Sequence, residues 1–171
     1  EGARMTHGDS ASLKLPFRDP LPESVAALVE PLFEPQRLQA GSVIFREGSA
    51  YDFISVITLG RVALEMSVPA RGDVRILTLG PGDLLGWSPL FGRGTMTATA
   101  IASDDLQLLS ASGHALRELC ERDHEVGYFL YRALADALSR RLLATRLQLI
   151  DIFSRESPTV DGAAQYPMQQ N

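Results

Sequence analysis

The sequence contains few of the residues on which disulfide-stabilised, metal-binding and catalytic proteins depend. Its 171 residues include one cysteine, Cys120, so an internal disulfide cannot form, which is consistent with a reducing compartment. Its three histidines, His7, His114 and His124, do not have the spacing of a metal site. No nucleophile is paired with a base in a recognisable arrangement, so we expect no enzymatic activity.

Long apolar segments and an excess of positive charge are also missing. No run of about 18 apolar residues occurs, so the sequence predicts no membrane span. The N-terminus lacks the basic-then-apolar pattern of a signal peptide. The formal net charge is −5, whereas a dedicated nucleic-acid-binding domain is usually basic. We therefore expect a cytoplasmic protein with no membrane association and no direct contact with DNA.

Composition divides the chain into three parts. Residues 1–20 are rich in small and polar side chains, and we expect them to be flexible. Residues 21–153 carry regular apolar patterns and form the expected domain. Residues 154–171 contain turn formers without periodicity and little apolar weight, so a flexible tail is predicted there.

Short strand signals follow one another from Arg37 to about Ser110. Residues 62–68 alternate apolar and polar side chains with period two, which predicts a half-buried strand, and the turn formers at 69–73 predict a hairpin with a long tip. Further strands are expected at residues 43–45, 53–57, 74–77, 97–101 and 106–109. Many short strands separated by glycine turns indicate a sandwich or a barrel.

Helical patterns flank the strands. A helix is expected from Leu21 to Val29, with Pro22 in its first turn, and helix returns near Ser112. Asp123 is a suitable N-cap for a long helix over residues 124–153. At about 1.5 Å per residue, such a helix extends over roughly 40 Å, which is more than a small barrel can cover.

One face of the long helix has a heptad pattern, in which residues recur at alternating spacings of four and three. This seam predicts a parallel homodimer, and a single wide core face is the alternative. A second face is expected to pack on the strands of the same chain. The seam consists of Tyr131, Ala135, Leu138, Leu142, Thr145 and Leu149, continuing to Ile152; the second face consists of Val126, Leu130, Ala133, Leu134 and Ala137.

Three glycine-containing motifs occur in an order that a known family shares. They are GSVIFREG from Gly41, ITLGRV from Ile57, and GDLLGWSPL from Gly82, which TMTATA follows from Thr95. With the flanking helices, residues 21–153 resemble the cyclic nucleotide-binding domain family, of the catabolite activator protein type. The resemblance implies a mainly β fold with flanking helices, a double-stranded β-helix (jelly-roll) barrel and a long C-terminal dimerisation helix. No DNA-binding domain is expected, because only the tail follows Phe153.

In that family the third motif is the phosphate-binding cassette. Backbone N–H groups, an arginine and a following hydroxyl hold the cyclic phosphate, and a glutamate accepts the ribose 2′-hydroxyl. Aligned on Gly86 and on residues 98–100, the arginine position is Met96 and the glutamate position is Trp87. Thr97 retains the hydroxyl. The ligand-binding residues that the resemblance implies are Leu85, Gly86, Trp87, Ser88, Arg93, Met96 and Thr97.

Several of these residues have two interpretations. Arg93, between two glycines, either turns into the anion site as a substitute cation or is an exposed loop arginine. Trp87 either stacks on a ring of the ligand or fills the barrel mouth. Cys120 is interpreted as a small buried hydrophobe rather than a reactive thiol. A haem-binding variant of the fold would need a well-placed axial ligand, and the only candidates outside the termini and residues 123–125 are His114 and Cys120, so we do not expect haem.

Two functional hypotheses follow. In the first, the chain is a stand-alone, homodimeric regulatory domain that binds cyclic AMP or cyclic GMP weakly, or another small anionic ligand. Each hydrogen bond to a charged partner is worth about 1.5–3 kcal/mol, so losing two weakens binding by about 3–6 kcal/mol, or two to four decades. In the second, the domain is degenerate, binds no nucleotide and is a dimeric interaction module for an unknown protein partner.

Overall fold

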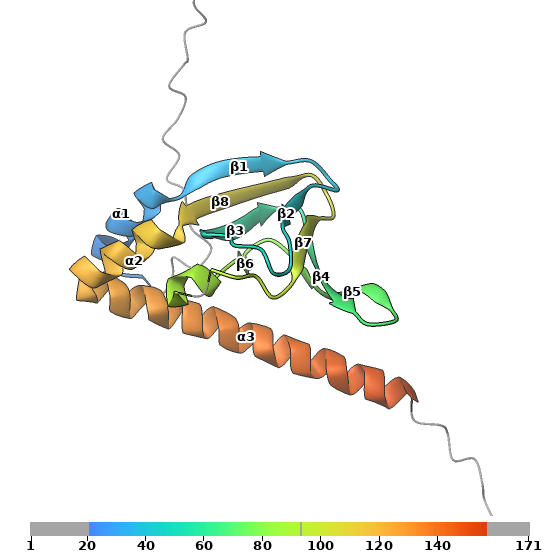
Figure 1. Cartoon of the computed structure of the whole chain (residues 1–171). Helices are drawn as coiled ribbons and strands as arrows, with labels where there is room; N and C mark the ends of the chain where they lie inside the picture. The colour runs from blue at the N-terminus through green and yellow to red at the C-terminus, as the bar shows by residue number, and fades with distance from the viewer. Residues whose placement is uncertain (1–20, 93, 157–171) are drawn as a thin grey trace, which may run out of the picture. The chain divides into compact units, whose positions relative to one another are not determined.

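Two four-stranded antiparallel sheets make up the β part of the computed structural model, which describes residues 21–92 and 94–156 (Figure 1). One sheet has the order β1-β8-β3-β6 and the other β2-β7-β4-β5. The strands are β1 (Glu34–Leu38), β2 (Val43–Phe45), β3 (Phe53–Leu59), β4 (Val62–Val68), β5 (Gly72–Leu79), β6 (Leu84–Leu85), β7 (Thr99–Ala102) and β8 (Leu106–Ser112).

The strand pairing is nested. β1 pairs with β8, β2 with β7, β3 with β6 and β4 with β5, all antiparallel. A chain that folds back on itself in this way and rolls into two sheets is a double-stranded β-helix, or jelly roll. The mainly β fold expected from the sequence is therefore confirmed.

Three helices occur in the described residues, and their residues up to Leu138 pack against one face of the β1-β8-β3-β6 sheet. They are α1 (Glu23–Val29), α2 (Gly113–Arg122) and α3 (His124–Glu156), with short 3₁₀ turns η1 (Glu30–Leu32) and η2 (Ser88–Phe91). Asp123 Oδ1 accepts hydrogen bonds from the N–H groups of Glu125 (3.0 Å) and Val126 (3.1 Å), so the predicted N-cap is confirmed. No helix in the described ranges is both long and apolar enough to span a membrane.

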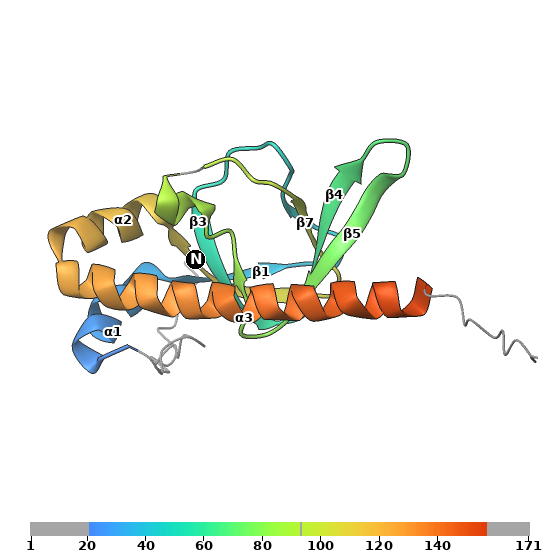
Figure 2. The same ribbon diagram turned by 90° about the horizontal axis from the view of Figure 1, so that it is seen from below.

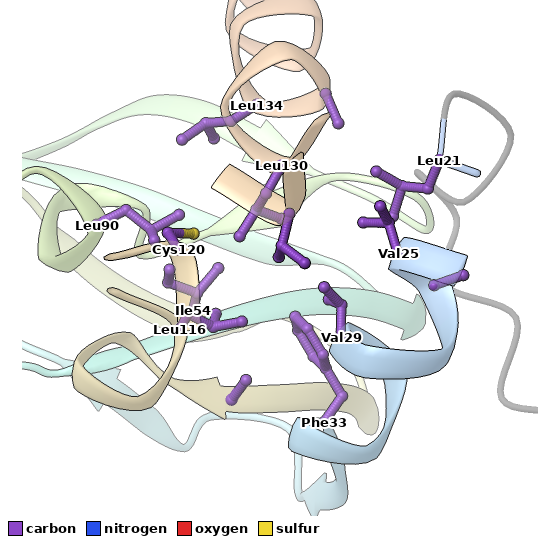
Figure 3. Close-up of a cluster of buried hydrophobic side chains, with 14 of the residues drawn as sticks. Leu21, Val25, Val29, Phe33, Ile54, Leu90, Leu116, Cys120, Leu130 and Leu134 are labelled. Atoms are coloured by element: carbon purple, nitrogen blue, oxygen red, sulfur yellow. The ribbon is translucent and has the colours of Figure 1, made fainter. Parts of the chain in front are cut away.

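Alternate side chains of β3 and β8 face two separate apolar clusters. Ile54 and Val56 face the helix-side cluster, which α1, α2 and the start of α3 complete (Figure 3). Ile57 and Leu108 face the barrel cluster between the two sheets. Figure 3 shows Cys120 among the aliphatic side chains of the helix-side cluster, and the thiol is buried, which confirms its interpretation as a small hydrophobe.

The second face of α3 packs as expected. Four of its five residues belong to the helix-side cluster and are buried, and the fifth is half-buried; the buried ones are Val126, Leu130, Ala133 and Leu134. The chain divides into two compact units, and the first of them ends at Leu138. From Ser139 the helix is a unit of its own, in which Leu142, Leu143 and Leu147 are exposed.

The β4–β5 hairpin differs from its predicted form. Gly72 and Asp73 belong to β5, so the tip is shorter than expected, and Ala70 there has a φ of +66°. The period-two pattern also predicts a buried Met66, but this side chain is 36% exposed. β7 pairs with β4 only as far as Glu65, so nothing in the sheet covers the outer half of the hairpin, which projects in Figure 2.

Candidate functional site

The cassette, residues 82–97, begins with backbone bonds that fix it to β3. Gly82 N donates to the Ile57 carbonyl (2.8 Å), and Ile57 N donates to the Asp83 carbonyl (3.1 Å). The Asp83 carboxylate accepts the N–H of Gly80 at 2.8 Å and closes the turn. β6 then pairs with β3, with Leu85 opposite Ser55. Leu85 is thereby placed in the barrel cluster, where it is buried.

Gly86 follows with a backbone conformation that strongly favours glycine. Its φ is +73°, in the left-handed region. A Cβ at this position would lie 2.7 Å from the Phe53 carbonyl oxygen and 3.2 Å from the Tyr51 ring. The glycine therefore lets the chain turn sharply while the cassette stays in contact with the start of β3.

A side-chain hydrogen bond from α2 attaches the 3₁₀ turn η2 to that helix. The Arg117 guanidinium donates a hydrogen bond to the Pro89 carbonyl, and it lies 3.7 Å from the Asp52 carboxylate. Asp52 also accepts hydrogen bonds from the Ser112 hydroxyl (3.1 Å) and the His114 N–H (3.2 Å) at the start of α2. The cassette, the approach to β3 and the α2 N-terminus therefore share one polar network.

A second contact links η2 to α3. The Tyr131 hydroxyl donates to the Leu90 carbonyl at 3.1 Å, and the Tyr131 and Phe91 ring centroids are 6.0 Å apart. Partial burial raises the pKa of Tyr131, so the hydroxyl stays protonated and remains a donor near neutral pH. Sequence analysis assigns Tyr131 to the dimer seam; in the structure it contacts the cassette of its own chain.

The last part of the cassette is fixed by the turn after β2. Met96 N donates to the Ser49 carbonyl (3.0 Å), Gly48 N donates to the Met96 carbonyl (2.8 Å), and Tyr51 N donates to the Gly94 carbonyl (2.9 Å). The Met96 side chain is 4% exposed and belongs to the barrel cluster. The position at which the family resemblance implies an arginine is thus occupied by an apolar core side chain.

The remaining predicted ligand residues lie at different depths. Gly86, Trp87 and Ser88 are half-buried, and Trp87 packs against the helix-side cluster. Thr97 is exposed and precedes β7, which begins at Thr99 rather than at residue 97 as expected. Arg93 lies outside the described residues, so its two interpretations stay open.

Sequence analysis misses a set of hydrogen-bonded hydroxyl groups, including two buried serines, next to strand β6 of the cassette. Ser55 and Ser110 are opposite each other in β3 and β8, and their hydroxyl oxygens are 2.7 Å apart. Burial raises the pKa of Tyr51, and its hydrogen bond with Ser55 lowers it by a smaller amount. A serine in the middle of the apolar segment 53–57 is the signal that could have revealed this set.

Two further observations concern the Cys120 thiol and the potential metal ligands among the described residues. Burial raises the pKa of the Cys120 thiol, which disfavours the reactive thiolate. Within the described residues, no three His, Cys, Asp or Glu side chains are grouped in a way that could hold a metal ion.

Removing the Tyr131 hydroxyl tests the η2–α3 contact. We expect Tyr131→Phe to lower the free energy of unfolding by about 0.5–1.5 kcal/mol, the net value of one hydrogen bond. Chemical denaturation measures this change. The matched variant Tyr128→Phe, on an exposed tyrosine of the same helix, should change stability by less than about 0.5 kcal/mol. Equal effects of the two variants would contradict a role for the Leu90 contact.

Comparisons with known proteins identify the family. The profile of the cyclic nucleotide-binding domain matches residues 35–123, more than half of the chain. Over 142 residues the chain is 28% identical to a CRP-like cAMP-activated global transcriptional regulator of Mycobacterium tuberculosis, covering 83% of this chain and 61% of that protein. The chain thus spans about three-fifths of the length of this relative.

Solved structures agree with this match. The N-terminal domain of a transcriptional regulator from Streptomyces coelicolor superposes with a TM-score of 0.63 at 28% identity, covering 75% of this chain and 94% of that one. The Thermus thermophilus catabolite activator protein gives a TM-score of 0.63 at 27% identity, covering 81% of this chain and 63% of that one. The chain belongs to the cyclic nucleotide-binding domain family, of the catabolite activator protein type.

Proposed function

We propose that residues 21–153 form a homodimeric, cytoplasmic regulatory sensor domain whose atypical cassette binds cyclic AMP or cyclic GMP weakly, or takes another small anion. One observation carries this proposal. The cassette keeps its backbone turn and its attachment to α2 and α3, whereas its arginine position holds the buried Met96. The backbone frame for an anion is retained, but position 96 does not supply the charge that would bind the anion tightly.

Among the described residues of the cassette, the groups proposed to hold an anion are neutral. They are the backbone N–H groups of Gly86, Trp87 and Ser88 and the hydroxyl of Thr97, a set that can approach an anion but supplies no positive charge. Trp87 offers no carboxylate to a ribose hydroxyl. The expected loss relative to a complete cassette is therefore about 3–6 kcal/mol of binding free energy.

The contacts of η2 supply a route by which an occupied cassette would act on the helices. Arg117 of α2 and Tyr131 of α3 donate to consecutive carbonyls of η2, those of Pro89 and Leu90. A ligand that draws η2 toward the barrel must stretch or break these bonds. The ligand would then bias the position of the two helices by its different affinity for the two arrangements.

Calorimetric titration of the chain with cyclic AMP and cyclic GMP tests the sensor function. We expect dissociation constants well above a micromolar, with detectable heat at millimolar ligand. Complete absence of binding by both nucleotides and by smaller phosphate anions would favour the second hypothesis, a dimeric protein-interaction module. That alternative is supported by the burial of Met96, because an apolar side chain there completes the core without any ligand.

The proposed dimer is tested on the exposed part of α3. Leu142, a seam residue, is 53% exposed, and Leu147, on the opposite side of the heptad, is 58% exposed. We expect Leu142→Glu to give monomers in sedimentation, because a charge at the centre of a helix pair is desolvated without a partner. Leu147→Glu, a matched control, should leave the dimer intact. A wild-type chain that sediments as a monomer at micromolar concentration would refute the homodimer.

Other seam residues are less suitable for this test. Leu138 packs partly against the helix-side cluster of its own chain, so its replacement would also destabilise the fold. Thr145 is half-buried and its hydroxyl donates to the Arg141 carbonyl at 3.0 Å. Ala135 is exposed, and its side chain is so small that removing it would change the dimer interface little. The side chains of Leu149 and Ile152 lie outside the described residues.

A further inference from the structure

A separate depression lies at the other end of the barrel. Its volume is about 440 Å³, within the range of small-molecule sites. It is formed where β1 ends and β8 begins, at the end of these strands away from α2 and η2 (Figure 1). The residues that line it and carry the argument are Arg37, Leu38, Leu59, Asp105, Leu106 and Gln107.

The strand register brings these side chains together. Arg37 in β1 and Leu59 in β3 are both opposite Gln107 of β8, which lies between them. The Thr58 hydroxyl donates to the Gln107 carbonyl at 3.1 Å and fixes the irregular end of β3. Leu59 is 53% exposed, an uncovered aliphatic side chain beside a cation and an amide. Arg37, Gln107 and Leu59, which lie side by side across the three strands, therefore combine apolar surface with polar groups in one site.

The charges of this depression do not neutralise each other. The neighbouring Asp104 is paired with Arg61, with N···O distances of 2.7 and 3.1 Å. Asp105 accepts the Ala40 N–H at 3.1 Å through Oδ1, and its second oxygen has no partner among the described residues. Arg37 likewise makes no ion pair in the described part of the chain. One cation and one carboxylate thus line the same depression without contact closer than 4.0 Å.

We propose that this depression binds a small zwitterion with an apolar side chain, namely an aliphatic α-amino acid. The Arg37 guanidinium would hold the ligand carboxylate in a two-point contact. Asp105 and the Gln107 side-chain amide would accept hydrogen bonds from the ligand ammonium. The exposed Leu59 would cover the aliphatic side chain, with the half-buried Leu38 beside it.

The same set of groups disfavours other ligands. A phosphate dianion at Arg37 would be repelled by Asp105 in the same depression. A metal cation would find one carboxylate and a guanidinium, which is a poor donor set. The site shares no residue with the cassette, so this inference does not depend on the proposed sensor function.

An NMR titration of the isotope-labelled chain with L-leucine tests this inference. We expect saturable shifts at the amides of residues 37–39, 59 and 105–107. Isocaproate lacks the ammonium and isoamylamine lacks the carboxylate, so each should bind at least tenfold more weakly, the loss of one charged hydrogen-bond partner. No saturable shift up to about 10 mM leucine, or an analogue that binds as tightly as leucine, would overturn the proposal.

Two variants locate the contacts. Arg37→Gln and Asp105→Asn should each weaken leucine binding at least tenfold, and Asp105→Asn keeps the Oδ1 that accepts the Ala40 N–H. Arg71→Gln, at the hairpin tip, is the matched control and should bind leucine unchanged. Thermal melts verify that all three variants are folded. Equal affinity of Arg37→Gln and the control would overturn the assignment. Cyclic AMP should shift amides of the cassette and leave those of residues 37–39, 59 and 105–107 unchanged, which separates the two sites.

Discussion

The double variant Trp87→Glu/Met96→Arg is expected to bind cyclic AMP about two to four decades more tightly than the wild-type chain. The substitutions supply a guanidinium for the cyclic phosphate at position 96 and a carboxylate for the ribose hydroxyl at position 87, where the wild-type chain has neither. The backbone of Gly86 and the attachment of η2 are already in place. Calorimetry on both chains measures the gain directly.

The structure adds a second expected result for this variant. Because Met96 is buried in the barrel cluster, a charged side chain there must either be desolvated or turn out of the core. The double variant should therefore melt at a lower temperature than the wild type without ligand. Cyclic AMP should recover part of the loss, since a ligand that binds only the folded state stabilises it. The same ligand should hardly change the wild-type melting temperature.

Met66→Arg is the matched control for this experiment. It makes the same chemical change at an exposed methionine on the hairpin, so it should alter neither cyclic AMP binding nor stability by more than about 0.5 kcal/mol. A wild-type chain that binds cyclic AMP below about a micromolar would contradict our interpretation of Trp87 and Met96. A group such as Arg93 would then have to supply the missing charge.

The strands that the sequence predicts are those with a clear apolar pattern. β3, β4 and β8 are recognisable because they contribute side chains to a cluster. The sequence pattern does not predict β1, because its residues are mostly exposed and Pro35 interrupts the pattern. Its place at the sheet edge explains why a proline is tolerated. β6 has two residues, too few for any periodicity.

The candidate site was predictable in its backbone and not in its surroundings. The glycine spacing of the cassette indicates the turn at Gly86, and the structure has it. The contact between Tyr131 and Leu90 joins residues 41 positions apart, so only the packing of α3 reveals it. The same holds for Ser55 and Ser110, whose pairing depends on strand register. Local patterns therefore locate the cassette, and tertiary structure shows what holds it.

Gly86→Ala is expected to lower the free energy of unfolding by about 2–5 kcal/mol, a large part of the stability of a domain of this size. Two costs add. The left-handed backbone at Gly86 disfavours any residue with a Cβ. The new Cβ would also lie 2.7 Å from the Phe53 carbonyl oxygen, and a backbone atom can yield only if β3 and the cassette separate.

Comparison with Gly48→Ala isolates the second cost, the close approach of the new Cβ to Phe53. Its φ of +75° nearly equals the +73° of Gly86, but a Cβ at Gly48 meets nothing within 4 Å. Gly48→Ala should therefore cost only the conformational part, about 1–2 kcal/mol. Chemical denaturation of both variants gives the difference, and hydrogen exchange at Leu85 should accelerate only in Gly86→Ala, because β6 must move away from Ser55. If the two variants lose equal stability and Leu85 stays protected, the close approach at Gly86 does not hold the cassette against β3.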